Sequence, residues 1–173
     1  MSDHSPTYHP PPDAGLDIRY LDDDLLVVDK PAGLLSVPGR GPDKQDCLSA
    51  RVQARYPEAL PVHRLDLGTS GLLVLARGPE MHRALNRLFA TRGVEKRYVA
   101  LVAGRMEASE QVIDLPLIAD WPNRPLQMVD HAIGKPSRTR LCVVGYEPWL
   151  DATRVDLFPE TGRSHQLRAH LQA

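Results

Sequence analysis

The sequence predicts an α+β fold with a mixed, mainly antiparallel sheet flanked by helices. Seven segments have the apolar or alternating pattern of short strands, and three have the apolar spacing of helices. Many short strands combined with few helices are typical of α+β proteins. A chain of 173 residues is long enough to form one domain with a sizeable core.

The first half of the chain contains three expected strands and two expected helices. Residues 16–20 and 25–30 alternate like short strands, and the continuous apolar run of residues 71–76 is typical of a central strand. Residues 48–56 carry apolar side chains four apart, which indicates a helix. Residues 79–92 form an amphipathic helix that starts at a proline. Its apolar stripe consists of Met81, Ala84, Leu85, Leu88 and Phe89.

The second half contains four expected strands and one helix. The strands cover residues 98–102, 112–118, 138–146 and 153–158, all rich in β-branched or large apolar side chains. A helix is expected over residues 163–171, directly after a Thr-Gly turn.

Composition limits the class of protein. The hydrophobic fraction is 42% and the formal net charge is −1, which is ordinary for a globular chain. No apolar stretch approaches the length of a membrane span. Residues 1–15 are rich in proline and histidine and lack the apolar core of a signal peptide, so we expect a flexible leader and a cytoplasmic protein. Cys47 and Cys142 lack metal-ligand spacing, so we expect reduced thiols and no metal site.

Positive charge is concentrated locally despite the near-zero net charge. Basic residues gather between residues 83 and 97 and again between 163 and 168. A protein that binds nucleic acid needs positive potential along one face only. Arg83 and Arg87 lie one helical turn apart, where like charges repel by a few tenths of a kcal/mol. A polyanion beside them would reverse that cost, although a solvated surface explains the same charges.

One loop is the strongest candidate for chemistry. The run HRLDLGTSGLLVLA at residues 63–76 places Asp66 between Arg64 and a Thr-Ser-Gly turn that leads into an apolar strand. An aspartate before a glycine is most often a turn former. A cation on the last helix, Arg168, could hold the Asp66 carboxylate ionised and oriented through a bidentate contact.

Five segments resemble, in order, motifs of the RluA family of pseudouridine synthases, which isomerise uridine in structured RNA. The resemblance extends over about residues 17–173, nearly the whole chain. The matching segments are DDLLVVDKPAGLLSVPG (23–39), HRLDLGTSGLLVLA (63–76), KRYVA (96–100), LPLIADWPNRP (115–125) followed by GKP (134–136), and TGRSHQLR (161–168).

The resemblance implies a fold, a reaction and site residues. The fold would be the pseudouridine synthase catalytic fold, and the target uridine would be flipped out of its stack. Asp66 matches the essential aspartate, which either attacks the ribose carbon or removes a neighbouring ribose proton. Tyr98 matches the tyrosine that packs against the flipped base, and Arg168 matches the arginine that pairs with the aspartate. The expected substrate-binding residues are Arg64, Lys30, Arg163, Thr69, Arg83, Arg87 and Lys96.

The resemblance also implies partners and domain limits. The fourth segment is closest to the branch that modifies both transfer RNA and ribosomal RNA. We therefore expect an anticodon stem-loop of tRNA (position 32) and a large-subunit stem-loop of 23S rRNA (position 746) as substrates. We expect no metal and no organic cofactor, and a monomer that does not bind membranes. Residues 16–173 would form the catalytic domain, truncated at its C-terminus.

Other functions remain open at this point. A non-catalytic RNA-binding module or RNA chaperone would share the basic residues without the reaction. A hydrolase that uses Ser70 and His63 lacks support, because the G-x-S-x-G elbow is absent and His63 and His165 read as structural hydrogen-bonding residues. A protein-kinase catalytic loop is excluded, since Leu65 separates Arg64 from Asp66 and no glycine-rich phosphate loop precedes it.

Overall fold

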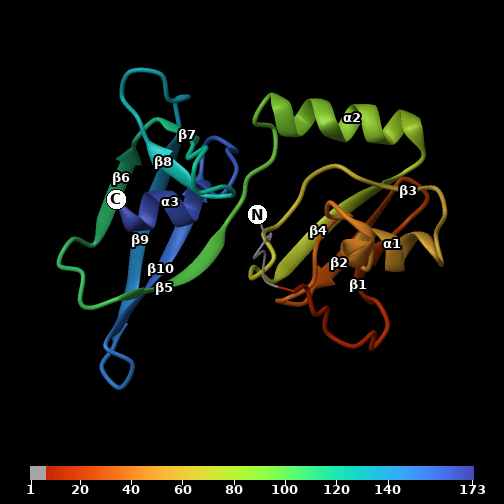
Figure 1. Cartoon of the computed structure of the whole chain (residues 1–173), viewed down its shortest axis with the longest axis horizontal. Coiled ribbons are helices and arrows are strands. Elements are labelled where there is room, and N and C mark those ends of the chain that lie inside the picture. Colours follow the sequence, from red (N-terminus) through yellow and green to blue (C-terminus); the bar gives the residue numbers. More distant parts are fainter. Residues whose placement is uncertain (1–6) are drawn as a thin grey trace. The chain divides into compact units, whose positions relative to one another are not determined.

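The computed structural model describes residues 7–173 and divides into two compact units, Met1–Gly93 and Val94–Ala173. Figure 1 shows the helices and strands of both units. Each unit combines an antiparallel sheet with at least one helix, so the predicted α+β class is confirmed. Every recorded pairing between the described strands is antiparallel, and these strands form three sheets.

The first unit is built on a four-stranded sheet in the order β1-β2-β4-β3. The strands are β1 (Asp17–Leu21), β2 (Leu25–Lys30), β3 (Ala59–Pro61) and β4 (Gly71–Arg77). The predicted strands at residues 16–20, 25–30 and 71–76 are therefore present. The central strands β2 and β4 supply buried leucine and valine side chains to the core: Leu26, Val28, Leu73 and Leu75 are fully buried.

Two helices and a short 3-10 turn complete this unit. They are η1 (Pro42–Lys44), α1 (Leu48–Gln53) and α2 (Pro79–Ala90). The thiol of Cys47 caps α1 by accepting a hydrogen bond from the Ala50 amide (3.5 Å). Helix α2 packs against β3 and β4, and most of its predicted apolar stripe is only half-buried. Helix α1 ends three residues earlier than predicted, and the turn that follows carries the chain into β3.

The second unit contains a four-stranded sheet in the order β5-β10-β9-β6. Its strands are β5 (Tyr98–Ala103), β6 (Glu110–Asp114), β9 (Arg138–Glu147) and β10 (Ala152–Pro159). The core of this unit consists of Ile113, Leu141, Val155 and Leu157. Half-buried side chains from β5 and from the last helix pack against the same cluster, so the sheet and that helix share one core.

A small hairpin and the last helix complete the second unit. The hairpin pairs β7 (Leu117–Ala119) with β8 (Gln127–Val129), and the helix is α3 (Gln166–Gln172). Helix α3 starts three residues later than predicted, because His165 adopts a left-handed conformation (φ 50°) and ends the preceding turn.

The single strand predicted over residues 112–118 is wrong, because the segment divides between two sheets. Its first part is β6, which pairs with β9, and its last part is β7, which pairs with β8. Pro116 lies between them and has no amide hydrogen to donate to a strand ladder. Strands β3 and β8, of three residues each, are too short to give a pattern in the sequence.

Part of the predicted leader lies within the described residues. Residues 7–15 have no regular secondary structure, yet the Tyr8 hydroxyl donates to the Asp46 carbonyl (3.0 Å) and accepts from the Leu35 amide (3.0 Å). Residues 1–6 lie outside the described part of the chain. Both cysteines are free thiols, with Cys47 buried and Cys142 half-buried. Over residues 7–173, no helix is both long and apolar enough to cross a bilayer.

Candidate active site

The loop between β3 and β4 carries Asp66 on a tight turn. The Thr69 amide donates a hydrogen bond to the Asp66 carbonyl (3.1 Å), which closes a turn over residues 66–69. The Asp66 side chain is half-buried, whereas the buried Leu65 side chain before it anchors the loop in the core. Asp66 therefore lies on a turn that leads into the apolar strand β4 (Gly71–Arg77), as the sequence predicts.

Ser36 fixes the backbone on one side of Asp66. Its hydroxyl donates to the Leu65 carbonyl (2.8 Å) and accepts from the Leu65 amide (3.0 Å). Ser36 itself is buried, so both hydrogen bonds are shielded from water. The residue before Asp66 is thus held through both of its backbone polar groups by a side chain almost thirty positions earlier.

Lys30 fixes the backbone on the other side of Asp66. Its ammonium is buried and donates to the carbonyls of Pro31 (2.9 Å), Leu34 (2.6 Å) and Leu67 (3.3 Å). Burial lowers the pKa of Lys30 to about 8, and the negative charge of Asp66 opposes that shift. All three protons are engaged by carbonyls, so the geometry does not support the predicted phosphate contact of Lys30.

His63 has a structural role in the same unit. Its Nε2 accepts a hydrogen bond from the Val74 amide (3.0 Å), and its ring stacks on Phe89 with 4.9 Å between centroids. A neutral imidazole has one acceptor nitrogen, and in His63 that nitrogen already accepts the Val74 amide, so Nδ1 carries the proton. His63 is then not a base for Ser70, and this geometry speaks against the serine hydrolase alternative. It agrees with the structural reading of His63.

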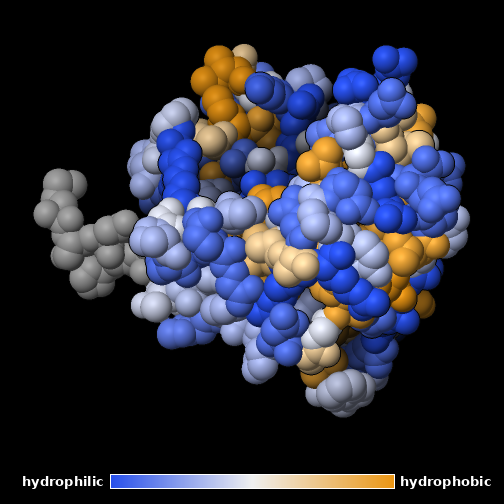
Figure 2. Space-filling model, turned by 90° about the vertical axis from the view of Figure 1, so that its right-hand side faces the viewer, coloured by the Kyte–Doolittle hydropathy of each residue, from blue (hydrophilic) through white to orange (hydrophobic). Residues whose placement is uncertain are grey.

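The expected RNA contacts of the first unit differ in exposure. Arg64, Arg83 and Arg87 are exposed, and Thr69 is half-buried in the Asp66 turn. Figure 2 shows that one face of the molecule is mostly hydrophilic, with hydrophobic residues in several separate places. Hydropathy does not mark a binding face in this view, and the three arginines are candidates because they are exposed and charged.

The second unit carries two of the expected site residues, Tyr98 and Lys96, on β5 and just before it. Tyr98 is half-buried and packs against the core cluster of Ile113, Leu141, Val155 and Leu157. Lys96 is half-buried too, and burial lowers the pKa of its ammonium.

Arg163 and Arg168 lie before and on α3, and both are exposed. The Arg163 guanidinium donates to the Pro136 carbonyl (3.3 Å). On α3, Leu167 packs against the same core cluster as Tyr98, so the elements that carry Tyr98 and Arg168 share one core. Asp66 belongs to the first unit and Arg168 to the second, and their pairing stays a prediction.

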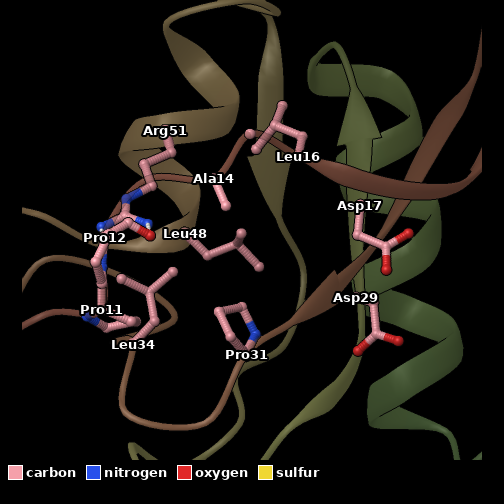
Figure 3. Close-up of a pocket in the computed structure, with 11 residues that line it drawn as sticks. Pro11, Pro12, Ala14, Leu16, Asp17, Asp29, Pro31, Leu34, Leu48 and Arg51 are labelled. Carbon is pink, nitrogen blue, oxygen red and sulfur yellow. Dashed lines mark hydrogen bonds between the residues drawn. The ribbon is translucent and has the colours of Figure 1, made fainter.

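A pocket of about 380 Å³ lies in the first unit, lined mainly by apolar side chains of the N-terminal segment and α1. Figure 3 shows Pro11 and Pro12 on one side, with Leu34 and Leu48 beside them. Asp66 is not among its lining residues. Its charged lining residues are already paired, Arg51 with Asp46 (2.8 Å), and Asp17 and Asp29 with Arg19 (2.9 and 3.0 Å), so the pocket offers little chemistry to a ligand.

Two features of this site escaped sequence reasoning. The first is Ser36, a buried polar residue. It stands inside an apolar run of the sequence, and a single polar residue in such a run was the signal that could have indicated its role. The second is the set of hydrogen bonds that Thr139, Gln166 and His170 make beneath α3, for which the signal was Gln166 within the TGRSHQLR segment. Among residues 7–173, no group of three or more histidine, cysteine or acidic side chains is placed to hold a metal ion.

Comparison with known proteins identifies the family. The sequence profile of the RNA pseudouridylate synthase family matches residues 24–173. The chain belongs to this family. Its members are isomerases that convert uridine in RNA to pseudouridine, so the predicted family and enzyme class are confirmed.

Curated relatives are similar over almost the whole chain. The chain is 51% identical over 169 residues to the dual-specificity RNA pseudouridine synthase RluA of Vibrio parahaemolyticus, covering 96% of this chain and 68% of that protein. It is 49% identical over 166 residues to the RluA of Escherichia coli K12, covering 96% of this chain and 75% of that protein.

Solved structures share the fold. Human RNA pseudouridylate synthase domain containing 1 superposes with a TM-score of 0.74 and 31% identity, over 94% of this chain and 66% of that one. Human RNA pseudouridylate synthase domain containing 4 gives a TM-score of 0.71 and 26% identity, over 90% and 63%. The chain therefore spans about two thirds of the length of these structures.

Proposed function

We propose that this pseudouridine synthase modifies two RNAs, a tRNA anticodon stem-loop and a stem-loop of large-subunit ribosomal RNA. The observation that carries the proposal is identity of about 50%, over 96% of the chain, to enzymes named for dual specificity. The motif that resembles the dual-specificity branch is the LPLIADWPNRP segment at residues 115–125. This segment forms β7 and the loop that leads to β8.

The reaction exchanges one glycosidic bond for another. The N1–C1′ bond of uridine breaks, the base turns, and a C5–C1′ bond forms. The proton on C5 leaves and N1 gains a proton, so reactant and product are isomers. The reaction therefore consumes no oxidant, reductant or second substrate. The protein must hold the ribose and the detached base in register, which is a task of positioning.

Asp66 acts on the ribose in this proposal, either by attacking C1′ or by removing a neighbouring ribose proton. Either role requires an ionised carboxylate in a fixed direction. The hydrogen bonds of Ser36 to Leu65 and of Lys30 to Leu67 support this role, because they hold the backbone on both sides of Asp66. Arg168 pairs with the carboxylate in a charge-assisted contact.

The remaining residues hold the RNA. Tyr98 packs against the flipped base and assists loss of the C5 proton, and Arg64 fills the space that the base leaves in the stack. Exposed arginines neutralise phosphates. A monomeric state and a cytoplasmic location stay predictions. The further phosphate contacts that we propose are Arg83, Arg87, Lys96, Arg163 and, through its hydroxyl, Thr69.

Tritium release from 5-tritiated uridine RNA tests the proposal directly. The substrates are an anticodon stem-loop and a ribosomal stem-loop, each with a matched control in which cytidine replaces the target uridine. We expect release from both stem-loops and none from either control. Release from one stem-loop alone would reject dual specificity. Binding of both without release would favour a non-catalytic RNA-binding module.

A further inference from the structure

Helix α3 has two faces with different roles. Gln166, Ala169 and His170 are buried, whereas Arg168 is exposed. Gln166 and His170 are four residues apart and share one face. Arg168 is two residues from each, about 200° around the helix, and so it points to the opposite side. Whatever holds the buried face therefore sets the direction of Arg168.

One hydroxyl joins both buried polar side chains of this face. The Oγ1 atom of Thr139, on β9, lies 3.0 Å from Nε2 of Gln166 and 2.9 Å from Nδ1 of His170. Thr139 is fully buried. On its other side the His170 ring reaches the Leu115 carbonyl, 3.1 Å from Nε2. Helix α3 is thus tied to β9 and to the residue that follows β6.

The direction of each hydrogen bond follows from its chemistry. A carbonyl only accepts, so Nε2 of His170 carries the proton and Nδ1 accepts. The Thr139 hydroxyl then donates to Nδ1 of His170, and its oxygen accepts from Nε2 of Gln166. Every donor in this series of hydrogen bonds has an acceptor. A buried network whose hydrogen bonds are all satisfied specifies one geometry.

The same glutamine fixes the turn before the helix. Its Oε1 accepts from the Thr161 hydroxyl (2.8 Å) and from the Arg163 amide (3.0 Å). The Thr161 hydroxyl oxygen in turn accepts from the Arg138 amide (2.9 Å). Gln166 therefore connects the turn, the helix and the sheet through its two amide atoms.

We propose that Thr139, Gln166 and His170 are positioning residues that hold Arg168 in its working direction. This inference rests on the proposed role of Arg168 in catalysis. A seven-residue helix is marginal by itself and depends on its tertiary contacts. Arg168 has a long side chain, so a small rotation of the helix displaces its guanidinium by an ångström or more. Displacements of about 1 Å can cost about 10²-fold in rate.

The test replaces the central hydroxyl by a methyl group of the same shape. In Thr139→Val we expect kcat for tritium release to fall about tenfold or more, with KM for RNA within about twofold, because positioning of a reacting group acts on kcat. Thr139→Ser keeps the hydroxyl and should restore most of the rate. The matched control is Thr153→Val, which removes another buried hydroxyl of this unit away from α3.

Hydrogen exchange supplies a readout that does not depend on turnover. We expect Thr139→Val to accelerate exchange of the α3 amides, while Thr139→Ser and Thr153→Val leave them protected. Unchanged α3 exchange in Thr139→Val would overturn the positioning role, whatever the activity. A kcat equal to that of the wild type in Thr139→Val would overturn it as well.

Arg168→Lys separates this inference from the function on which it rests. Lysine keeps the charge but loses the bidentate fork, so turnover should fall strongly if Arg168 pairs with the catalytic carboxylate. Normal turnover in Arg168→Lys and Arg168→Ala would reject the role of Arg168 in catalysis, and with it the functional part of the inference. Faster exchange of α3 in Thr139→Val would then still support the structural part.

Discussion

The ammonium of Lys30 donates a hydrogen bond to the carbonyl of Leu67, the residue directly after Asp66 (3.3 Å). The Gly33 amide donates to the same carbonyl (2.8 Å). Lys30 at the end of β2 and Gly33 just after it thus hold the backbone at Leu67, and Ser36, further along the same segment, holds it at Leu65. A carboxylate on such a loop loses little entropy when the substrate arrives, which favours catalysis.

Lys30 should make stability depend on pH in the alkaline range. Its pKa is about 8 in the fold and 10.5 in the unfolded chain, because burial disfavours the ammonium. Between these pH values the unfolded chain binds more protons than the folded chain. The free energy of unfolding therefore rises as the pH increases from about 8 to 10.5, and it falls as the pH decreases over the same range. Urea unfolding of the wild type and Lys30→Met across this range measures the difference.

The wild type should gain stability relative to Lys30→Met as the pH rises, at up to about 1.4 kcal/mol per pH unit. Lys135→Met, which removes an exposed lysine, is the control. A constant offset between the wild type and Lys30→Met would contradict a depressed pKa of Lys30.

Ser36→Ala should loosen the Asp66 loop. The change leaves the buried amide and carbonyl of Leu65 without their partner, at a cost of about 1–3 kcal/mol. We expect a lower free energy of unfolding and a lower kcat, with KM for RNA little changed. Ser49→Ala is the matched control, since Ser49 is equally buried but its hydroxyl lies by the Cys47 thiol instead (3.4 Å). Equal kcat in both variants would contradict a role for Ser36 in catalysis.

The buried imidazole of His170 should weaken the fold in mild acid. Burial lowers its pKa below the ordinary 6.5, although the Leu115 carbonyl and the Asp114 charge oppose that shift. Below pH 6.5 the unfolded chain binds a proton that the folded chain excludes, so stability falls as the pH drops towards the folded pKa. The free energy of unfolding of the wild type should therefore fall more steeply between pH 7 and 5 than that of His170→Asn. Parallel curves would show that burial does not lower this pKa.

The sequence predicted the long elements well and the short ones poorly. Apolar runs such as β4 and amphipathic spacing such as α2 are set by burial on one face, which a pattern records. The strand predicted over residues 112–118 ignored Pro116, which ends one ladder before the next begins. For the site, the motif resemblance singled out Asp66, whose catalytic role stays a prediction, and it placed Lys30 on phosphate, which the hydrogen bonds of Lys30 do not support. The buried position of Lys30 depends on three carbonyls from separate turns, and a linear pattern does not contain that information.

The exposed arginines of α2 should contribute to RNA affinity through charge. Replacing both Arg83 and Arg87 by alanine should weaken binding and make it less sensitive to salt, with a slope of log K against log[salt] lower by about 1.4–1.8 if each contacts one phosphate. Filter binding at about 50–300 mM salt measures the slope, because phosphate contacts make affinity fall steeply over about this range of salt concentration. Arg19→Ala is the control, because Arg19 is exposed but already pairs with Asp17 (2.9 Å) and Asp29 (3.0 Å). An unchanged slope in the double variant would exclude α2 from the RNA-binding surface.

The central claim is that Asp66 carries the reaction, and Asp66→Asn tests it most directly. Asparagine preserves the size of the side chain but neither attacks the ribose nor accepts its proton at a useful rate. Single-turnover tritium release is measured at RNA concentrations that saturate both proteins, so that differences in affinity cancel. We predict that Asp66→Asn binds the stem-loop at least as tightly as the wild type and releases tritium at least about 100-fold more slowly. Release at the wild-type rate would contradict the assignment of Asp66.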